Sequence, residues 1–268
     1  MFKIIKKIQF SKEANRMKSI ANTKIARELY YSSKSNNVRF LLNKRFSWMN
    51  KFINTEDHGI EVGSGAGFSK DFINNKNFKL TDLGNDDHLD FKNIDAQNTG
   101  FEDNKFNYVI ASNMIHHIPY PIKFFKEIFR ILKPGGKLII FESYCSIFFQ
   151  IATLIMKHEG FDFTLNVWDE KNPKSDTENA WHGNIAVPHL IFDDKKTFEK
   201  NLGHLFNIEY EKLTECLIFL NSGGVTSKTT CIPMNNFFLN ILNFIDKLLV
   251  KFFPNIFCMG RRLVLIKK

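Results

Sequence analysis

The sequence predicts an α/β fold, in which helices cover both faces of a mainly parallel, doubly wound sheet. Short runs with the composition of buried strands occur at residues 60–62, 78–81, 108–111 and 138–141. Between them lie helical patterns at 67–74 and 121–132. Strands that alternate with helices in this way pair in parallel through crossover connections, and a parallel sheet needs helices on both of its faces.

The helix expected at residues 121–132 has clear boundaries. Pro121 suits the first turn of a helix, because the N–H that proline lacks would have no partner there. Pro134-Gly135-Gly136 then stops the helix. One face carries the apolar side chains of Phe124, Phe125, Ile128, Phe129 and Leu132. This amphipathic spacing is typical of a helix packed against a sheet.

We expect one large α/β domain with additions on both sides. Residues 1–55 form an N-terminal helical, basic segment, residues 56–143 the core of the fold, and residues 144–268 a cap followed by strands that complete the same sheet. Helical spacing in the first segment covers residues 11–31 and 36–52. The last segment contains helical patterns near 146–157, 194–201 and 236–253, and strand patterns within 206–220 and 256–267.

Positive charge is concentrated at the N-terminus. The net charge of the chain is +9, and residues 1–51 contain 13 Lys and Arg residues but only two acidic ones, Glu13 and Glu28. Two interpretations stay open. The basic residues form a solvated helical face, or they attract an anionic membrane surface, a phosphate-bearing substrate or nucleic acid.

The Phe-rich helix at 236–253 has an unusually wide apolar arc. It is a poor membrane span, because Asp246 and two lysines lie within about eighteen residues. It either packs against the sheet or lies in a bilayer interface. The four cysteines form no C-x-x-C pair, and the N-terminus does not resemble a signal peptide. We therefore expect a soluble cytoplasmic protein, with peripheral attachment at the inner face of a membrane as the alternative.

A glycine-dense turn follows the first strand, in the run from Gly59 to Phe68. Glycines tolerate positive φ and let a ligand approach the bare backbone. A dinucleotide fingerprint would need a glycine where Phe68 stands, so a nicotinamide-dependent oxidoreductase is disfavoured. The carboxylate of Glu61 would repel phosphate and suits a cationic amino or sulfonium ligand. Asp82 ends the second strand, where an acidic side chain either accepts hydrogen bonds from ribose hydroxyls or caps a loop.

Four consecutive motifs resemble those of class I S-adenosylmethionine-dependent methyltransferases, with a domain similar to methyltransferase type 11. They are Glu61–Gly67, Ile94–Ala96, Phe106–Ile118 and Arg130–Leu138. The resemblance covers roughly residues 58–142, and the L-K-P-G-G run within the last motif is its most specific part. One departure is Asn107, which stands where the family usually has aspartate.

The resemblance implies a Rossmann-like sheet and S-adenosylmethionine as cofactor. It implies that the turn residues Glu61, Gly63, Ser64, Gly65 and Gly67 surround the methionine part of the cofactor. Asp82 would hold the ribose. Asp95 and the backbone of Ala96 would contact the adenine, and Asn113 would lie near the methionine carboxylate and the departing methyl group.

Methyl transfer from a sulfonium is an in-line displacement that depends on alignment and exclusion of water, so no metal is required. A hydroxyl acceptor would benefit from a base, for which His116 and His117 are the candidates. Alternatively, the side chain of one of these two histidines points into the fold and does not act as a base. Three other histidines, His88, His189 and His204, lack metal-ligand spacing.

The resemblance also implies that segments after the fifth strand shape the acceptor pocket. The candidate substrate contacts there are His158, Glu159, Trp181 and His182. We expect a small-molecule or glycan-type acceptor, with a lipid-linked acceptor at a membrane surface as the alternative. An alternative of another class is a non-catalytic, cofactor-binding partner subunit. Nucleic acid is not an expected substrate, because no N-P-P-Y-type motif follows the fourth strand.

Overall fold

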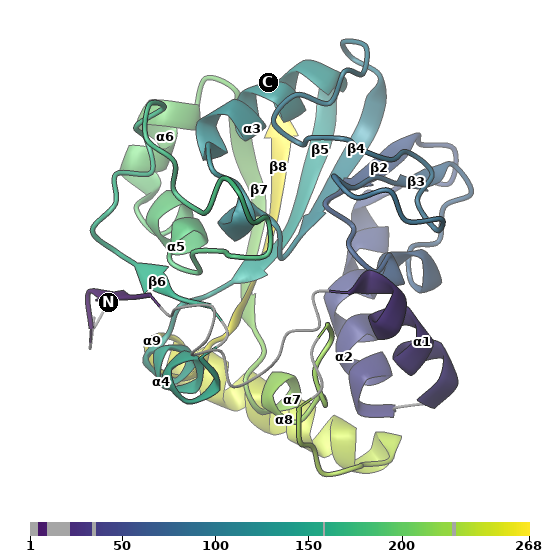
Figure 1. The fold of residues 1–268 in the computed structure, drawn as a ribbon, viewed down its shortest axis with the longest axis vertical. Helices are drawn as coiled ribbons and strands as arrows, with labels where there is room; N and C mark the ends of the chain where they lie inside the picture. The colour runs from purple at the N-terminus through teal and green to yellow at the C-terminus, as the bar shows by residue number, and fades with distance from the viewer. Residues whose placement is uncertain (1–4, 10–21, 34–35, 158, 227–228) are drawn as a thin grey trace.

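The computed structural model describes residues 5–9, 22–33, 36–157, 159–226 and 229–268, and it has a six-stranded sheet at its centre (Figure 1). The strands are β2 (Gly59–Val62), β3 (Phe78–Leu80), β4 (Phe106–Ser112), β5 (Leu132–Ser143), β7 (Phe206–Thr214) and β8 (Gly260–Lys267). Their spatial order is β3-β2-β4-β5-β8-β7. The predicted α/β class is confirmed.

Three of the strand pairings are parallel. β2 pairs in parallel with β3 and with β4, and β4 pairs in parallel with β5. β8 runs antiparallel to both of its neighbours, β5 and β7. The carboxyl ends of β2, β4 and β5 therefore meet at one edge of the sheet, where α/β proteins form their ligand sites.

Three predicted elements are shorter than expected. The strand predicted at 256–267 begins at Gly260, because residues 256 and 257 belong to the short helix α9 (Pro254–Phe257). The helix predicted at 67–74 is only the 3₁₀ turn η3 (Phe68–Asp71). The strand predicted over 206–220 ends at Thr214, and α7 (Leu217–Leu220) follows it. The carboxylate of Asp246 accepts hydrogen bonds from the main-chain N–H groups of Cys216, Leu217 and Ile218, which stabilises the start of α7 instead of a continued strand.

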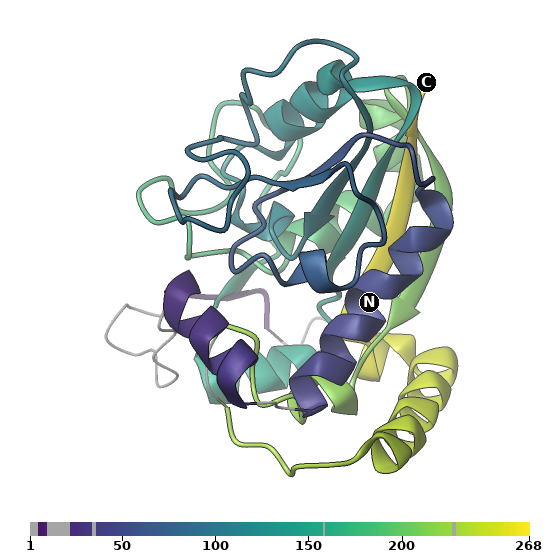
Figure 2. The same cartoon turned by 90° about the vertical axis from the view of Figure 1, so that its right-hand side faces the viewer.

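Helices cover both faces of the sheet (Figures 1 and 2). On one face α3 (Pro121–Ile131), α5 (Val187–Phe192) and α6 (Lys195–Leu202) contribute to a fully buried cluster that includes Phe124, Phe125 and Phe192. On the other face α2 (Asn36–Phe46) and the 3₁₀ helix η2 (Ser47–Phe52) pack Leu42 and Met49 against the sheet. Burial of these side chains provides the main stabilisation of the fold.

The N-terminal segment contains α1 (Thr23–Ser33), α2 and η2, while most of the predicted helix at 11–31 lies outside the described residues. Some of its basic side chains make internal contacts. Arg45 forms a buried ion pair with Glu215 at 2.8 Å, and the Arg27 guanidinium donates to the carbonyl of Ala66 at 2.5 Å. For these two residues, the interpretation as a solvated basic face is wrong.

The cap lies below the carboxyl edge of the sheet in Figure 1. It contains α4 (Ile147–Met156), α8 (Asn236–Phe252) and α9 (Pro254–Phe257), together with α7. The short strands β1 (Lys7–Ile8) and β6 (Phe161–Asp162) pair at its side. Within the described parts of the chain, no helix is both long enough and apolar enough to cross a membrane.

Candidate functional site

A cavity of about 950 Å³ opens at the carboxyl edge of β2, β4 and β5. Side chains from the N-terminal helices, the core loops and the cap all contribute to its wall. Eight of the predicted cofactor residues line it, namely Glu61, Gly63, Ser64, Gly65, Asp82, Asp95, Ala96 and Asn113. Pockets of this size accommodate a drug-sized ligand, so the cavity has room for a nucleoside-like cofactor and a small acceptor.

The glycine turn presents bare backbone to this cavity. Gly63 and Gly65 have φ angles of 63° and 52°, in the left-handed region that favours glycine. A Cβ at Gly63 would lie 3.0 Å from the Cβ of Met114, whereas one at Gly65 would have no neighbour within 4 Å and so faces open space. A ligand can therefore approach the main chain of Gly65 directly.

Gly67 has a different role from the one expected. It is absent from the described residues that line the cavity. A Cβ there would lie 2.8 Å from side-chain atoms of Leu80 and His88, and its φ is 67°. Gly67 is thus required for close packing behind the turn. His88 also supports the turn, because its Nε2–H donates to the carbonyl of Gly65 at 2.8 Å.

Glu61 is buried beside the turn and accepts a hydrogen bond from the Ser69 hydroxyl. Burial raises the pKa of Glu61 to about 8 because it disfavours the carboxylate, and the nearby Asp82 adds to the shift while Ser69 opposes it. Glu61 is therefore largely protonated at neutral pH in the absence of a cationic ligand. A positively charged group nearby would favour its ionised form.

Two further carboxylates are held in the loops that follow β3. Asp82 accepts hydrogen bonds from the main-chain N–H groups of Gly65 at 2.7 Å and Gly84 at 3.0 Å. Asp95 accepts from the main-chain N–H of Gln97 at 2.8 Å. An ionised carboxylate has about four acceptor positions, so both groups retain capacity for ligand hydroxyl or amino groups.

Asn113 follows β4 with a φ of 52°, and its N–H donates to the carbonyl of Phe141 at 2.7 Å. A residue other than glycine in this conformation is strained, and such residues cluster at functional sites. The strain is offset here by pairing with the main chain of β5. Asn113 thereby lies against the same cavity as the glycine turn.

His116 is buried in the 3₁₀ turn η4 (Ile115–His117), where its Nδ1–H donates to Glu142 Oε2 at 2.7 Å. Glu142, near the end of β5, also accepts from the main-chain N–H groups of Ile115 and Ser143. Burial alone would lower the pKa of His116, but the carboxylates of Glu142 and Glu159 outweigh it and raise the pKa to about 10. His116 therefore holds a proton at neutral pH and is not a free base.

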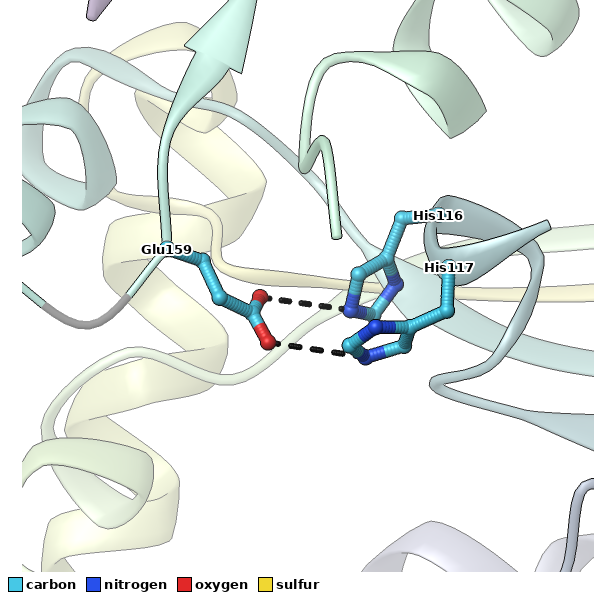
Figure 3. Close-up of side chains that lie close together, drawn as sticks. All are labelled: His116, His117 and Glu159. Atoms are coloured by element: carbon cyan, nitrogen blue, oxygen red, sulfur yellow. Dashed lines mark ion pairs between the residues drawn. The ribbon is translucent and has the colours of Figure 1, made fainter. Parts of the chain in front are cut away.

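Glu159 lies opposite both histidines (Figure 3). Its two carboxylate oxygens lie 3.4 Å from His116 Nε2 and 3.5 Å from His117 Nε2. All three residues line the cavity. The structure thus brings together two residues predicted as catalytic and one predicted to contact substrate.

The other predicted substrate contacts differ in position. Trp181 lines the cavity. His182 is absent from the described lining residues, and its Nδ1 lies 3.4 Å from Asp176 Oδ2. His158 lies outside the described residues. The prediction of a substrate contact at His182 has no support from the cavity geometry.

Several cavity residues had no recognisable signal in the sequence. Glu142, which holds the cavity residue His116 without lining the cavity itself, had none either, because the two residues meet only through the pairing of β4 with β5. The apolar part of the wall comes from α4, α7 and the following loop. Its members include Phe149, Met156, Phe219, Leu220 and Val225. Spacing within one helix cannot reveal a surface that forms only when distant segments meet.

Comparison with known proteins finds a family and relatives that match the central part of the chain, which carries much of this site. A family model described as a methyltransferase domain matches residues 60–140. A demethylmenaquinone methyltransferase of Staphylococcus epidermidis is 28% identical over 139 residues, which are 51% of this chain and 53% of that protein. The demethylmenaquinone methyltransferase of Clavibacter sepedonicus is 37% identical over 148 residues, covering 53% and 56% of the two chains. The chain thus spans about half the length of these curated relatives.

A solved structure shares the wider fold. An S-adenosylmethionine-dependent methyltransferase from Archaeoglobus fulgidus superposes with a TM-score of 0.50 at 15% sequence identity. The match covers 90% of this chain and 99% of that one. At this level of identity the likeness establishes a common fold.

Proposed function

The chain carries a class I S-adenosylmethionine-dependent methyltransferase domain, and on this premise we propose that it transfers a methyl group from that cofactor to a small-molecule acceptor. The observation that carries the proposal is the convergence of the glycine turn, Asp82 and Asp95 on one cavity. Bare backbone with two carboxylates suits an adenosyl ligand that offers hydroxyl and amino groups.

The proposed division of the cavity follows from these contacts. Glu61, Ser64, Gly63 and Gly65 hold the methionine part, where a cationic ligand also favours ionisation of Glu61. In the same proposal Asp82 binds the ribose, Asp95 and Ala96 bind the adenine, and Asn113 lies beside the methionine carboxylate. The bound cofactor would supply the electrophilic methyl group.

The other end of the cavity accepts the methyl acceptor in this proposal. In-line transfer depends chiefly on holding the acceptor against the methyl group and excluding water. The apolar side chains from α4 and α7 favour a ring-containing, largely apolar acceptor over the glycan-type acceptor. Some relatives are named for demethylmenaquinone, which agrees with a quinol-type acceptor here.

A proton must leave a hydroxyl-bearing acceptor during transfer. His117 and Glu159 face the cavity, whereas His116 is already protonated and held by Glu142. We therefore assign His116 to positioning, and the pair of His117 and Glu159 to accepting the proton when the acceptor carries a hydroxyl.

Incubation with S-adenosylmethionine and a panel of acceptors tests this function. The panel contains a reduced naphthoquinone, phosphoethanolamine and a simple glycan, with product detection by mass spectrometry. We expect methylation of the quinol and of neither polar acceptor. Cofactor binding without any methylated product would instead support the non-catalytic partner subunit.

A second candidate function places the same reaction at a membrane surface. The buried residues of α8 are Leu239, Asp246 and Val250, and Figure 2 shows the helix at the edge of the molecule. Its outer face exposes Phe237, Phe238, Ile241, Phe244, Ile245, Leu248 and Phe252. An apolar helix face with lysines at 247 and 251 suits the interface of an anionic bilayer. α8 contacts β7 with its other face, and the exposed face supports interfacial insertion, which would bring the cavity to a lipid-soluble acceptor.

A further inference from the structure

We propose that His116, His117 and Glu159 form a site for one divalent transition-metal ion of the Zn²⁺ type at the acceptor end of the cavity (Figure 3). Their ligand atoms lie within 4.8 Å of one another. The two histidines come from η4, and Glu159 comes from the segment between α4 and β6. Metal-ligand spacing was not apparent in the sequence because the third ligand belongs to a distant segment.

The distances fit ligands around a central ion. Metal–ligand bonds of about 2.0–2.2 Å in a tetrahedral site put neighbouring ligand atoms about 3.3 Å apart. Glu159 Oε2 lies 3.4 Å from His116 Nε2, and its other oxygen, Oε1, lies 3.5 Å from His117 Nε2, so each oxygen is near this separation from one histidine. Direct hydrogen bonds between charged groups are shorter, at about 2.7–2.9 Å. Both contacts of Glu159 are longer than this, so the spacing admits an ion between the three side chains.

Glu142 supplies the support that a metal-binding histidine needs. It accepts the Nδ1–H of His116 at 2.7 Å, so an ion would displace the proton on Nε2, the atom directed at Glu159, and bind there. Metal-ligating histidines usually donate their second ring N–H to a carboxylate, which fixes the tautomer and the ring orientation. Glu142 is itself held by two main-chain N–H groups.

The backbone around η4 is also fixed. The N–H of Asn184 donates to the carbonyl of His116 at 2.7 Å, and the Ser175 hydroxyl donates to the carbonyl of His117 at 2.6 Å. Gly183 packs so closely that a Cβ would lie 2.7 Å from His116 Cδ2. Both rings are thus confined before any ligand binds, as a preorganised site requires.

Three protein ligands leave one tetrahedral position open toward the cavity, as in catalytic zinc sites. The negative charges of Glu159 and Glu142 balance the charge of the ion. An acceptor hydroxyl at the open position would lose its proton more readily, because a divalent cation lowers the pKa of a bound oxygen. In the metal-loaded protein His117 and Glu159 are ligands, so the ion would lower the pKa of the acceptor hydroxyl and its proton would pass to solvent water instead of to that pair. This last step rests on the proposed function, whereas metal binding does not.

Calorimetric titration of the chelator-treated full chain with Zn²⁺ tests the site, with Co²⁺ absorption as a report of coordination. We expect one ion per chain. His117→Ala and Glu159→Gln should each weaken binding by at least about tenfold, and Glu142→Gln by about 10–100-fold. His204→Ala, an exposed histidine outside the cavity, is the matched control and should bind as the original chain does.

The metal site is overturned if no ion binds, or if binding is unchanged in both His117→Ala and Glu159→Gln. Titration of the same samples with S-adenosylhomocysteine checks that each variant is folded and separates the two proposals. Binding of the adenosyl ligand without Zn²⁺ removes only the metal site. Binding of Zn²⁺ without the adenosyl ligand supports the metal site and removes the proposed function.

Discussion

The main-chain N–H of Gly65 donates to the carboxylate of Asp82 at 2.7 Å, which ties the glycine turn after β2 to the end of β3. The same carboxylate is the proposed ribose ligand. One side chain therefore shapes the turn and offers acceptors to the cavity, and its removal should affect both stability and cofactor binding.

Asp82→Ala should weaken S-adenosylhomocysteine binding by at least about tenfold and lower the free energy of unfolding by about 1–2 kcal/mol. Asp82→Asn retains acceptor capacity on one oxygen, so its loss of affinity should be smaller. Calorimetry and urea unfolding measure the two quantities. Unchanged affinity in Asp82→Ala would remove Asp82 from the proposed cofactor site.

Glu61 should make the protein less stable as pH rises. Its pKa is about 8 in the folded chain and near 4.5 when unfolded, so between these values the folded state holds a proton that the unfolded state releases. The stabilising contribution is present below pH 4.5 and is lost as pH rises toward 8, by at most about 1.4 kcal/mol per pH unit. Glu61→Gln should flatten this slope in urea unfolding measured across the window. Equal slopes in both proteins would contradict the assigned pKa.

Removing one partner of the buried ion pair between Arg45 and Glu215 should strongly lower the free energy of unfolding. Arg45→Met leaves the Glu215 carboxylate buried without its cation, which should lower the free energy of unfolding by about 3–5 kcal/mol. Adding Glu215→Gln should recover much of this loss, since no buried charge remains. Chemical unfolding of both variants tests the pair. A loss below about 1 kcal/mol in the single variant would show that the pair contributes little.

Substitutions on the outer face of α8 should separate membrane attachment from folding. Phe244 is 59% exposed, so Phe244→Ser together with Phe237→Ser should change the unfolding free energy by less than about 1 kcal/mol. In flotation with anionic phosphatidylserine-containing vesicles, the original chain should float with the lipid and the double variant should not. As control, Leu83→Ser changes an exposed apolar residue outside α8. Equal flotation of all three proteins would rule out α8 as the attachment site.

The fold could be predicted because its signals are local. The run from Gly59 to Phe68 and the Pro-Gly-Gly stop after α3 each mark a boundary within a few residues, and the strands lie where these signals place them. The helix expected at 67–74 is instead the short 3₁₀ turn Phe68–Asp71, whose first residue Phe68 and the following Ile73 are both buried. The packing of these two side chains, and not local helical propensity, sets the backbone conformation of this segment.

The candidate site could be predicted only where one motif supplies it. Asp95 lies in one of the motifs and Asp82 at the end of a predicted strand, whereas Glu142 contacts His116, and Arg45 lines the cavity, only because distant segments pair and pack. The orientation of α8 was ambiguous for a related reason. An apolar arc this wide fits both a buried face and a lipid-facing one, and only the fold shows which side is exposed.

Calorimetric titration of the purified chain with S-adenosylmethionine, S-adenosylhomocysteine and NADH tests the central claim most directly, with Asp95→Ala as the matched variant. Both adenosyl ligands should bind with one site per chain, NADH should not bind, and Asp95→Ala should bind them more weakly. Binding of NADH, or no binding of either adenosyl ligand to the folded protein, would contradict the assignment of this cavity to S-adenosylmethionine.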